Sequence, residues 1–580
     1  TSAMSGNDLS TFPDYPAEIR APHNTVAGVS GYQVHIGSEI HTIGDKCDVL
    51  VAMNPASLRA NLQWVNMGGT IIVDADTFVE RAITKAGYES NPLEDGSLSS
   101  YNLIKAPISS AAKQVALEQG LELKEADRTK NMYALGMVAF MFDRDLQILS
   151  NQIAAKFKKK PKISETNIAV LKAGYIYAES IEAIESRYHI PTATLEKGKY
   201  RNISGNIATA WGLLAAAERS GRPLFLGSYP ITPATDILVE LAKHKSLNAR
   251  VMQCEDEIAG ICSSIGASYA GSMAVTSTSG PGLSLKSEAI GLAVMTELPV
   301  VIVDVQRGGP STGLPTKSEQ ADLFQVLYGR NGACPCIVVA ATSPSDCFET
   351  AYMAAKLSME HMTPTILMTD GYIGQGSELF RIPKVADMPS ITPPIAEKND
   401  PNYKPYRRDD KTLARKWAIP GTQGLEHRVG GLEKSDVFGA VSTDPNNHEK
   451  MVYFRNEKVQ RVADYLPNQE VIGDESGDLL VVSWGGTKGQ TYVAVKELQK
   501  QGKKVSLAHF KYIMPLPKNT ADIFAKFKKI VVCELNDGQF ADYLRIVYPK
   551  FVYHKYNKIK GIPFTTVELV NAFNQYLKEE

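Results

Sequence analysis

Residues 223–233 read Pro223-Leu-Phe-Leu-Gly-Ser-Tyr-Pro-Ile-Thr-Pro233, a short apolar run that leads directly into a proline-rich turn. Four further strand-like runs follow it at residues 274–278, 300–305, 336–340 and 365–369. Segments with helical patterns separate most of these runs. Strands that alternate with helices in this way predict a doubly wound α/β fold, with a parallel sheet between layers of helices.

The chain is too long for one hydrophobic core, because 580 residues at roughly 150 residues per domain predict three or four domains. Near the start, apolar runs at residues 48–54 and 69–74 flank a helical pattern and predict a βαβ unit. Helical patterns at residues 131–157 and 163–188 follow, whereas residues 1–30 are rich in turn formers and predict a loop.

Four parts are therefore expected along the chain. The first is residues 1–195, and the doubly wound sheet occupies residues 196–385. Residues 386–470, rich in Pro, Asp, Asn, Lys and Arg, predict an irregular connector. Residues 471–580 predict a smaller α/β unit, with strands at 479–484, 504–509 and 530–533 and a helix at 490–501.

Charge and cysteine content narrow the class of protein. The 62 basic and 63 acidic residues give a net charge of −1, which offers no general attraction to nucleic acid or to an anionic membrane. No apolar stretch approaches the ~20 residues that span a bilayer, and no secretory signal is visible. The seven cysteines form no Cys-x-x-Cys pair, so we expect buried thiols in a reducing compartment, the cytoplasm.

Two proline- and glycine-containing turns are candidates for ligand binding. The turn Tyr229-Pro-Ile-Thr-Pro233 has its backbone fixed by two prolines, so that the Thr232 hydroxyl could face a ligand. Ser279-Gly-Pro-Gly282 follows a strand and lets a ligand approach the backbone closely. Each turn also has an ordinary structural explanation. The first could simply begin a helix, and the second could be a common Gly-Pro turn.

Charged residues stand next to these turns. Gln253-Cys-Glu-Asp-Glu257 opens a helix that is too apolar to face water, so one of its carboxylates is a candidate general acid or base. The alternative is that these acids only complement the helix dipole. Arg307-Gly-Gly-Pro-Ser-Thr-Gly313 follows another strand, and its guanidinium suits a carboxylate ligand unless it is a surface side chain.

Taken together, these motifs resemble those of the α-subunit of the 2-oxoacid:ferredoxin oxidoreductases. The resemblance rests on Tyr229–Pro233, on Glu255-Asp-Glu257 with Ile265-Gly-Ala267, and on Arg307 to Lys317, in matching order over residues ~200–385. The first ~195 residues look like the γ-domain that is often fused ahead of α, and residues ~475–580 like a transketolase C-terminal-type domain. The fused arrangement looks most like 2-oxoglutarate enzymes.

The resemblance implies oxidative, CoA-dependent decarboxylation of a 2-oxoacid on thiamine diphosphate, giving acyl-CoA, CO2 and reduced ferredoxin, reversible in some members. The sheet at 196–385 would then be a pyrimidine-type domain for this cofactor. Glu257 looks like the family glutamate that hydrogen-bonds the aminopyrimidine N1′, with Glu255 as the rival. The resemblance further implies a substrate site of Thr232, Arg307 and Thr312, and cofactor contacts from Tyr229, Pro230, Ile231, Ser279 and Gly280.

Parts of such an enzyme are missing from this sequence. It has no Gly-Asp-Gly followed by Asn, the pattern that holds Mg and diphosphate, and no cluster of cysteines for an iron–sulfur centre. The resemblance implies that a separate β-subunit supplies Mg, the diphosphate site and a [4Fe–4S] cluster, in a dimer of αβ pairs. The γ-domain also lacks an opening strand and a glycine-rich loop, which predicts an incomplete or disordered start.

Three alternatives remain open. Within the family, a pyruvate or broad-specificity enzyme is the nearest, because Arg307 would bind a carboxylate that all 2-oxoacids share. A second cation near Thr312, with Lys317 and Arg330 as candidates, would favour 2-oxoglutarate. Outside that class, the chain could be a non-catalytic assembly subunit. A self-contained transketolase-like enzyme is opposed by the missing diphosphate motif.

Overall fold

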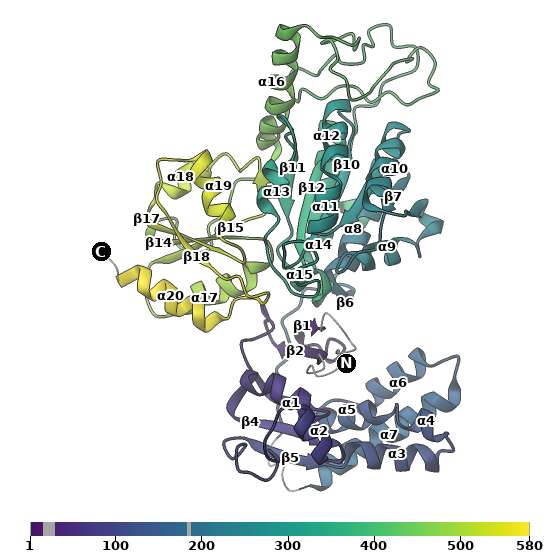
Figure 1. Cartoon of the computed structure of the whole chain (residues 1–580), viewed down its shortest axis with the longest axis vertical. Helices are drawn as coiled ribbons and strands as arrows, with labels where there is room; N and C mark the ends of the chain where they lie inside the picture. The colour runs from purple at the N-terminus through teal and green to yellow at the C-terminus, as the bar shows by residue number, and fades with distance from the viewer. Residues whose placement is uncertain (1, 16–28, 182–186, 579–580) are drawn as a thin grey trace. The chain divides into compact units, whose positions relative to one another are not determined.

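The computed structural model describes residues 2–15, 29–181 and 187–578 of the chain. The chain divides into two compact units, Thr1–Lys197 and Gly198–Glu580, each with hydrophobic clusters of its own (Figure 1).

A small parallel sheet in the first unit confirms the predicted βαβ arrangement. It contains β3 (Cys47–Ala52), β4 (Val65–Asp74) and β5 (Asn102–Ala106), with β4 in the middle. The helices α1 (Pro55–Asn61) and α2 (Glu80–Lys85) follow β3 and β4. The second half of β4 is fully buried, which is why it reads as an apolar run in the sequence.

The start of the chain differs from the prediction. Residues 8–14 were expected to form a loop, but β1 (Asp8–Asp14) pairs antiparallel with β2 (Gly31–Gly37). The prediction is wrong because this strand is defined by its pairing, whereas its composition is that of a turn. The predicted loop residues 16–28 lie outside the described residues.

A helical layer completes the first unit. Its members are α3 (Ile108–Glu118), α4 (Leu123–Ala126), α5 (Lys130–Met141), α6 (Leu146–Lys156) and α7 (Pro161–Ser180). The single helix predicted for residues 131–157 is wrong, because Asp143 has a left-handed φ of 49° and Asp145 caps a new helix. The helix predicted from Ile163 is confirmed to Ser180, and residues 182–186 lie outside the described part.

The second unit is built around a seven-stranded sheet in the order β16-β11-β12-β10-β9-β7-β8. All its neighbours are parallel except β16, which confirms the predicted doubly wound sheet. The strands are β7 (Leu224–Ser228), β8 (Ala249–Gln253), β9 (Met273–Thr278), β10 (Val300–Gln306), β11 (Ile337–Ala340), β12 (Thr365–Asp370) and β16 (Tyr512–Met514).

Helices cover both faces of this sheet (Figure 1). One layer contains α8 (Gly205–Ser220), α9 (Thr235–Leu241) and α14 (Asp346–His361). The other contains α10 (Glu257–Tyr269), α11 (Gly280–Leu285), α12 (Ser287–Thr296) and α13 (Leu323–Tyr328). A short helix, α15 (Gly371–Gln375), follows β12, and β13 (Ser377–Arg381) pairs with β6 (Tyr200–Ser204).

The segment predicted to be an irregular connector is partly helical. It ends in α16 (Pro445–Arg461), which begins behind the Asp444 cap, so the prediction is wrong for these residues. The rest has little regular structure but packs into the unit: Trp417 is fully buried and donates a hydrogen bond of 3.1 Å to the Ser268 carbonyl. Buried Glu297 at the end of α12 pairs with Arg408 and Lys458.

The predicted C-terminal α/β part is confirmed as a parallel sheet in the order β15-β14-β17-β18. Its strands are β14 (Gly477–Trp484), β15 (Val505–Phe510), β17 (Phe527–Glu534) and β18 (Tyr553–Asn557). Its helices are α17 (Lys488–Lys500), α18 (Thr520–Phe524), α19 (Gln539–Val547) and α20 (Thr566–Lys578).

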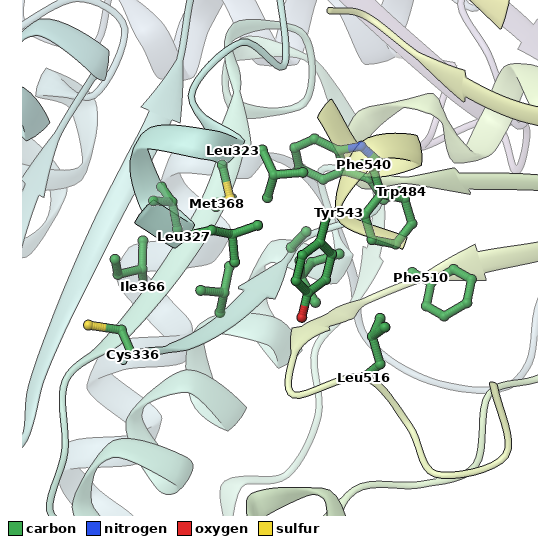
Figure 2. Close-up of a cluster of buried hydrophobic side chains, with 14 of the residues drawn as sticks. Leu323, Leu327, Cys336, Ile366, Met368, Trp484, Phe510, Leu516, Phe540 and Tyr543 are labelled. Atoms are coloured by element: carbon green, nitrogen blue, oxygen red, sulfur yellow. The ribbon is translucent and has the colours of Figure 1, made fainter. Parts of the chain in front are cut away.

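One hydrophobic cluster joins this part to the seven-stranded sheet. Figure 2 shows Leu323 and Met368 of the large sheet layer beside Trp484, Phe540 and Tyr543 of the C-terminal part. Burial of such large side chains on both sides fixes the two parts against each other. Within the described residues, no helix combines the length and the apolar character needed to cross a membrane.

Candidate active site

Three of the predicted motifs leave neighbouring strands at the same edge of the large sheet. The turn at Tyr229 follows β7, Ser279 follows β9, and Arg307 follows β10. These strands are adjacent and parallel, so their carboxyl ends lie together. This edge is where open α/β sheets bind ligands. The fold therefore brings together three motifs that are far apart in the sequence.

Arg307 is held at this edge by the backbone of the first motif. Its side chain is only 7% exposed, and its Nη1 donates a hydrogen bond of 2.7 Å to the carbonyl of Thr232. Its Nε is buried and has no partner among the described residues. Burial lowers the pKa of Arg307, and the nearby Asp322 carboxyl opposes that shift. An arginine remains charged under these conditions, so the unpaired edge can receive an anion.

Glu257 and Glu255 occupy different environments. Glu257 is 8% exposed and begins α10, whereas Glu255 is exposed. Asp256 between them caps the helix, since its Oδ1 accepts a hydrogen bond of 2.7 Å from the Ala259 backbone N–H. The helix dipole explanation thus suits Asp256, and Glu257 is the carboxylate that points into the protein.

The third motif provides the surface against which Glu257 packs. Ser279-Gly-Pro-Gly282 forms the cap and first turn of α11 rather than a free loop. A side chain at position 282 would clash with the Thr278 hydroxyl and would lie 2.8 Å from Glu257 Cγ and 3.0 Å from its Oε1. Glycine is therefore required at this position, and the Glu257 carboxyl lies directly against the motif.

Two buried carboxyls that the sequence analysis did not select lie beside the same motif. Asp304 projects from β10 and Asp322 precedes α13, and burial raises the pKa of both. Asp322 also lies against Gly280, where an added Cβ would be 2.6 Å from its Oδ1. Two neighbouring buried carboxyls cannot both ionise readily, so this pair retains a proton. The sequence did contain a signal for Asp304, because it is the one charged residue in the apolar run from Val300 to Val305.

Several buried polar atoms at this edge lack a partner among the described residues. They include Ser279 Oγ and Arg307 Nε, whereas Asp304 and Asp322 share a hydrogen bond with each other. Buried polar atoms in folded proteins almost always have partners, including ligands and ordered water. Their position at the carboxyl ends of β9 and β10 fits a ligand that brings its own hydrogen-bonding groups to this edge.

Other predicted residues lie further from the centre. Tyr229 is 40% exposed, Pro230 and Ile231 are half-buried, and the Thr232 side chain is exposed. Thr312 is exposed in a loop closed by the bridge between Gly308 and Leu314, and no described contact joins it to Arg307. Among the predicted substrate residues, Thr232 has a described hydrogen bond to Arg307, through its backbone carbonyl.

The two candidate cations have different surroundings. Arg330 donates hydrogen bonds to the carbonyls of Val326, Leu327 and Cys334, so its guanidinium holds a turn together. Lys317 packs its stem against Gly561, where an added Cβ would be 2.8 Å from Lys317 Cβ. Of the two, Lys317 is closer in the chain to the Arg307 loop.

The C-terminal part fixes the segment that follows Arg307. Gln320 Nε2 donates a hydrogen bond of 2.8 Å to the Trp484 carbonyl, and its Oε1 accepts one of 3.0 Å from the Leu535 backbone. The Ser318 backbone N–H donates to the Gly561 carbonyl at 3.3 Å. Residues 318–320 connect the Arg307 loop to α13. These contacts attach them to the loops of the C-terminal sheet.

The cysteines show no cluster-forming arrangement. All seven are free thiols, and the described residues contain no group of three or more His, Cys, Asp or Glu that could hold a metal ion. A hydrogen bond from Cys336 lowers the pKa of Cys334 to about 6, with Arg330 also contributing.

Comparison with known proteins agrees with this picture. Residues 216–444 match the family model described as pyruvate flavodoxin/ferredoxin oxidoreductase, thiamine diP-bdg, and residues 1–177 match pyruvate ferredoxin/flavodoxin oxidoreductase. The 2-oxoglutarate oxidoreductase subunit KorA of Mycobacterium tuberculosis is 49% identical, over 98% of this chain and 87% of that protein. The 2-oxoglutarate synthase subunit KorA of Methanocaldococcus jannaschii is 33% identical, over 59% of this chain and 90% of its own length.

A solved structure is similar over the whole chain. It is the 2-oxoglutarate:ferredoxin oxidoreductase of Magnetococcus marinus with 2-oxoglutarate, coenzyme A and succinyl-CoA bound, at a TM-score of 0.86 and 30% identity, covering 100% of this chain and 95% of that one. The KorA relative is similar enough, over enough of both chains, to establish the family. This chain therefore belongs to the 2-oxoacid:ferredoxin oxidoreductases, as one of their oxidoreductase subunits.

Proposed function

We propose that this chain is the catalytic subunit, with fused γ and α parts, of a 2-oxoglutarate:ferredoxin oxidoreductase. The reaction is the CoA-dependent oxidative decarboxylation of 2-oxoglutarate to succinyl-CoA and CO2, with electrons passed to ferredoxin. The names of the M. tuberculosis relative and of the M. marinus structure support this substrate. The observation that carries the proposal is the buried Glu257 carboxyl against Gly282, at the sheet edge where Arg307 has an unpaired Nε.

Each residue then has a role that its surroundings can support. Thiamine diphosphate, when bound, supplies the carbon nucleophile and the electron sink of the reaction. Glu257 holds a proton at the aminopyrimidine N1′, because it is the buried carboxyl next to the Ser279–Gly282 turn. Ser279 and Gly280 of that turn, together with the segment Tyr229 to Ile231, would hold the cofactor.

Substrate binding falls to Arg307. Its Nη1 is occupied by the Thr232 carbonyl, which fixes the plane of the guanidinium. The edge that carries the unpaired Nε can then bind the carboxylate next to the 2-oxo group. Thr232 and Thr312 would line the same substrate pocket. Of the two candidate cations, Lys317 is the better placed to bind the second carboxylate of 2-oxoglutarate.

The rest of the active site would come from a β-subunit that carries Mg, the diphosphate site and a [4Fe–4S] cluster. The described residues offer no cluster of metal-binding side chains to replace it. Large apolar side chains are exposed close to the site, with Met252 and Ile258 at 49% and Leu285 at 54%. Exposed apolar groups concentrated near a functional edge mark protein interfaces. We propose that the β-subunit covers them, in a cytoplasmic dimer of αβ pairs.

A pyruvate enzyme is the second candidate, because the descriptions of both matching family models name pyruvate. The two substrates differ in the distal carboxylate, so a pyruvate enzyme needs no second cation. The rates of dye reduction with 2-oxoglutarate and with pyruvate, measured at equal concentration, distinguish these two candidates.

The test is 2-oxoacid- and CoA-dependent reduction of a viologen dye under anaerobic conditions. The chain alone is compared with the chain co-purified with its natural partner, and E257Q is compared with E255Q in the complex. We expect activity only in the complex, with 2-oxoglutarate well above pyruvate, and loss of activity in E257Q alone. Activity from the isolated chain would contradict the shared site. Equal activity of E257Q and wild type would support a non-catalytic subunit.

A further inference from the structure

A fully buried lysine lies directly behind Glu257. Lys286 is 0% exposed and sits at the junction between α11 and α12. Its Nζ donates a hydrogen bond of 2.6 Å to the backbone carbonyl of Glu257. A lysine is seldom fully buried, because removing its charge from water is costly unless neighbouring groups compensate.

The groups that face Lys286 come from two neighbouring segments. Glu257 and Asp256 belong to the start of α10, Cys262 lies one turn further along it, and Cys254 follows β8. The two carboxylates favour the ammonium form, and burial disfavours it. Burial is the larger effect and lowers the pKa of Lys286 to about 8. Lys286 is therefore mostly charged at neutral pH, and it loses this charge in mildly alkaline solution.

Glu257 is thus held from two sides by one segment of chain. The side chain of Glu257 packs against Gly282, where the absence of a Cβ leaves just enough space for Glu257 Cγ and Oε1. On the backbone side, Lys286, four residues later, binds the Glu257 carbonyl. Residues 282–286 therefore determine both the position of the first turn of α10 and the space available to its carboxyl.

We propose that Lys286 is a positioning residue for Glu257, which fixes the first turn of α10 and places a positive charge behind the carboxyl that meets the cofactor. This inference rests on the proposed function, in which Glu257 acts at the aminopyrimidine. Lys286 itself does not touch substrate or cofactor. Its effect passes through Glu257, so its loss changes the chemistry of Glu257 without removing a ligand contact.

Lys458 provides a matched control at the other end of the sheet. It is also fully buried, burial also lowers its pKa to about 8, and its Nζ also donates to a backbone carbonyl, that of Met362 at 2.9 Å. Its carboxylate partner, Glu297, ends α12 just before β10 begins, whereas Arg307 follows the end of β10. Lys458 thus lies away from the Arg307 edge, and unlike Lys286 it also forms an ion pair with a buried carboxylate, that of Glu297.

The experiment compares K286M and K458M in the complex with the natural partner. Methionine has a similar volume and is apolar, so it suits a buried position. For K286M we expect an unchanged or higher Tm, a fall in kcat of about tenfold or more, and weaker binding of thiamine diphosphate by calorimetry. We also expect the wild-type kcat to fall as Lys286 loses its proton near pH 8, and we expect K286M to lack this alkaline limb. K458M should lose Tm and keep kcat, cofactor affinity and the limb.

A K286M protein with wild-type kcat, cofactor affinity and pH profile overturns the inference. So does a K286M protein that loses kcat only in proportion to folded protein, as expected for a purely structural lysine. If K286M does not fold, K286Q serves in its place, and persistence of the alkaline limb in K286Q overturns the inference. Loss of activity in E257Q with none in K286M rejects this inference alone, whereas full activity of E257Q rejects the proposed function.

Discussion

Replacing Gly282 by alanine tests the geometry of the site through a single methyl group. The added Cβ would clash with the Thr278 hydroxyl and lie 2.8 Å from Glu257 Cγ, at a position where carbon atoms normally approach to about 3.5 Å or more. The Glu257 side chain must therefore move by more than half an ångström, or α11 must shift. Overpacking of this kind costs about 1–3 kcal/mol of stability, and misplacing a catalytic group by ~1 Å can cost ~100-fold in rate.

The assay measures kcat for dye reduction and Tm for G282A and for G291A in the complex. Gly291 is the matched control, because it also lies in a helix of this layer but has no atom within 4 Å of an added Cβ. G291A should keep full kcat and gain up to about 1 kcal/mol, since alanine favours a helix. G282A should lose kcat by ~10- to 100-fold while remaining mostly folded. A G282A protein with the kcat of G291A would refute the placement of Glu257.

The remaining predictions concern substrate binding, acid stability and the buried ion cluster. R307K keeps the charge but lacks the planar guanidinium that binds Thr232 on one edge and a substrate carboxylate on another. The kcat/KM for the 2-oxoacid should therefore fall by ~10- to 100-fold while the KM for CoA is unchanged; equal kcat/KM would contradict this role. Burial lowers the pKa of His509 to about 3, so the unfolded chain takes up a proton that the folded chain does not, and stability falls as the pH drops below 6.5. At pH 4.5 the loss is about 3 kcal/mol, and the slope of Tm against pH should be shallower in H509Q; an equal slope in both proteins excludes His509 as its source. E297Q leaves Arg408 and Lys458 as buried cations without their carboxylate. The free energy of unfolding, measured with denaturant, should therefore fall by about 3–5 kcal/mol, while kcat per folded molecule stays unchanged. Wild-type stability in E297Q would show that the cluster contributes nothing.

The sequence predicted the strands of the large sheet best where both of their faces are buried. Strands such as β10 and β12 are buried along their whole length and are mostly apolar, because helices cover both sides. The edge strand β8 was missed, since two of its five residues, Arg250 and Gln253, are polar and its burial is low. Likewise β1 and β2 depend on pairing with each other, which composition does not reveal.

The site was predictable in its parts but not in its arrangement. The motifs around Thr232, Ser279 and Arg307 follow strands, so their meeting at one edge followed from the topology. The choice between Glu255 and Glu257 depends on which side of the helix start faces inward, and Asp256 as the cap decides that orientation. Lys286 resembled an ordinary helix-surface lysine in sequence, and only the fold shows that it is buried.

The central claim is that Glu257 meets the aminopyrimidine of thiamine diphosphate at this sheet edge. The most direct measurement is an experimental structure of the chain in complex with its natural partner and loaded with the cofactor. We expect the aminopyrimidine N1′ within ~3 Å of a Glu257 carboxyl oxygen, in contact with the turn from Ser279 to Gly282. An aminopyrimidine that lies against Glu255, or away from this edge, would contradict the account.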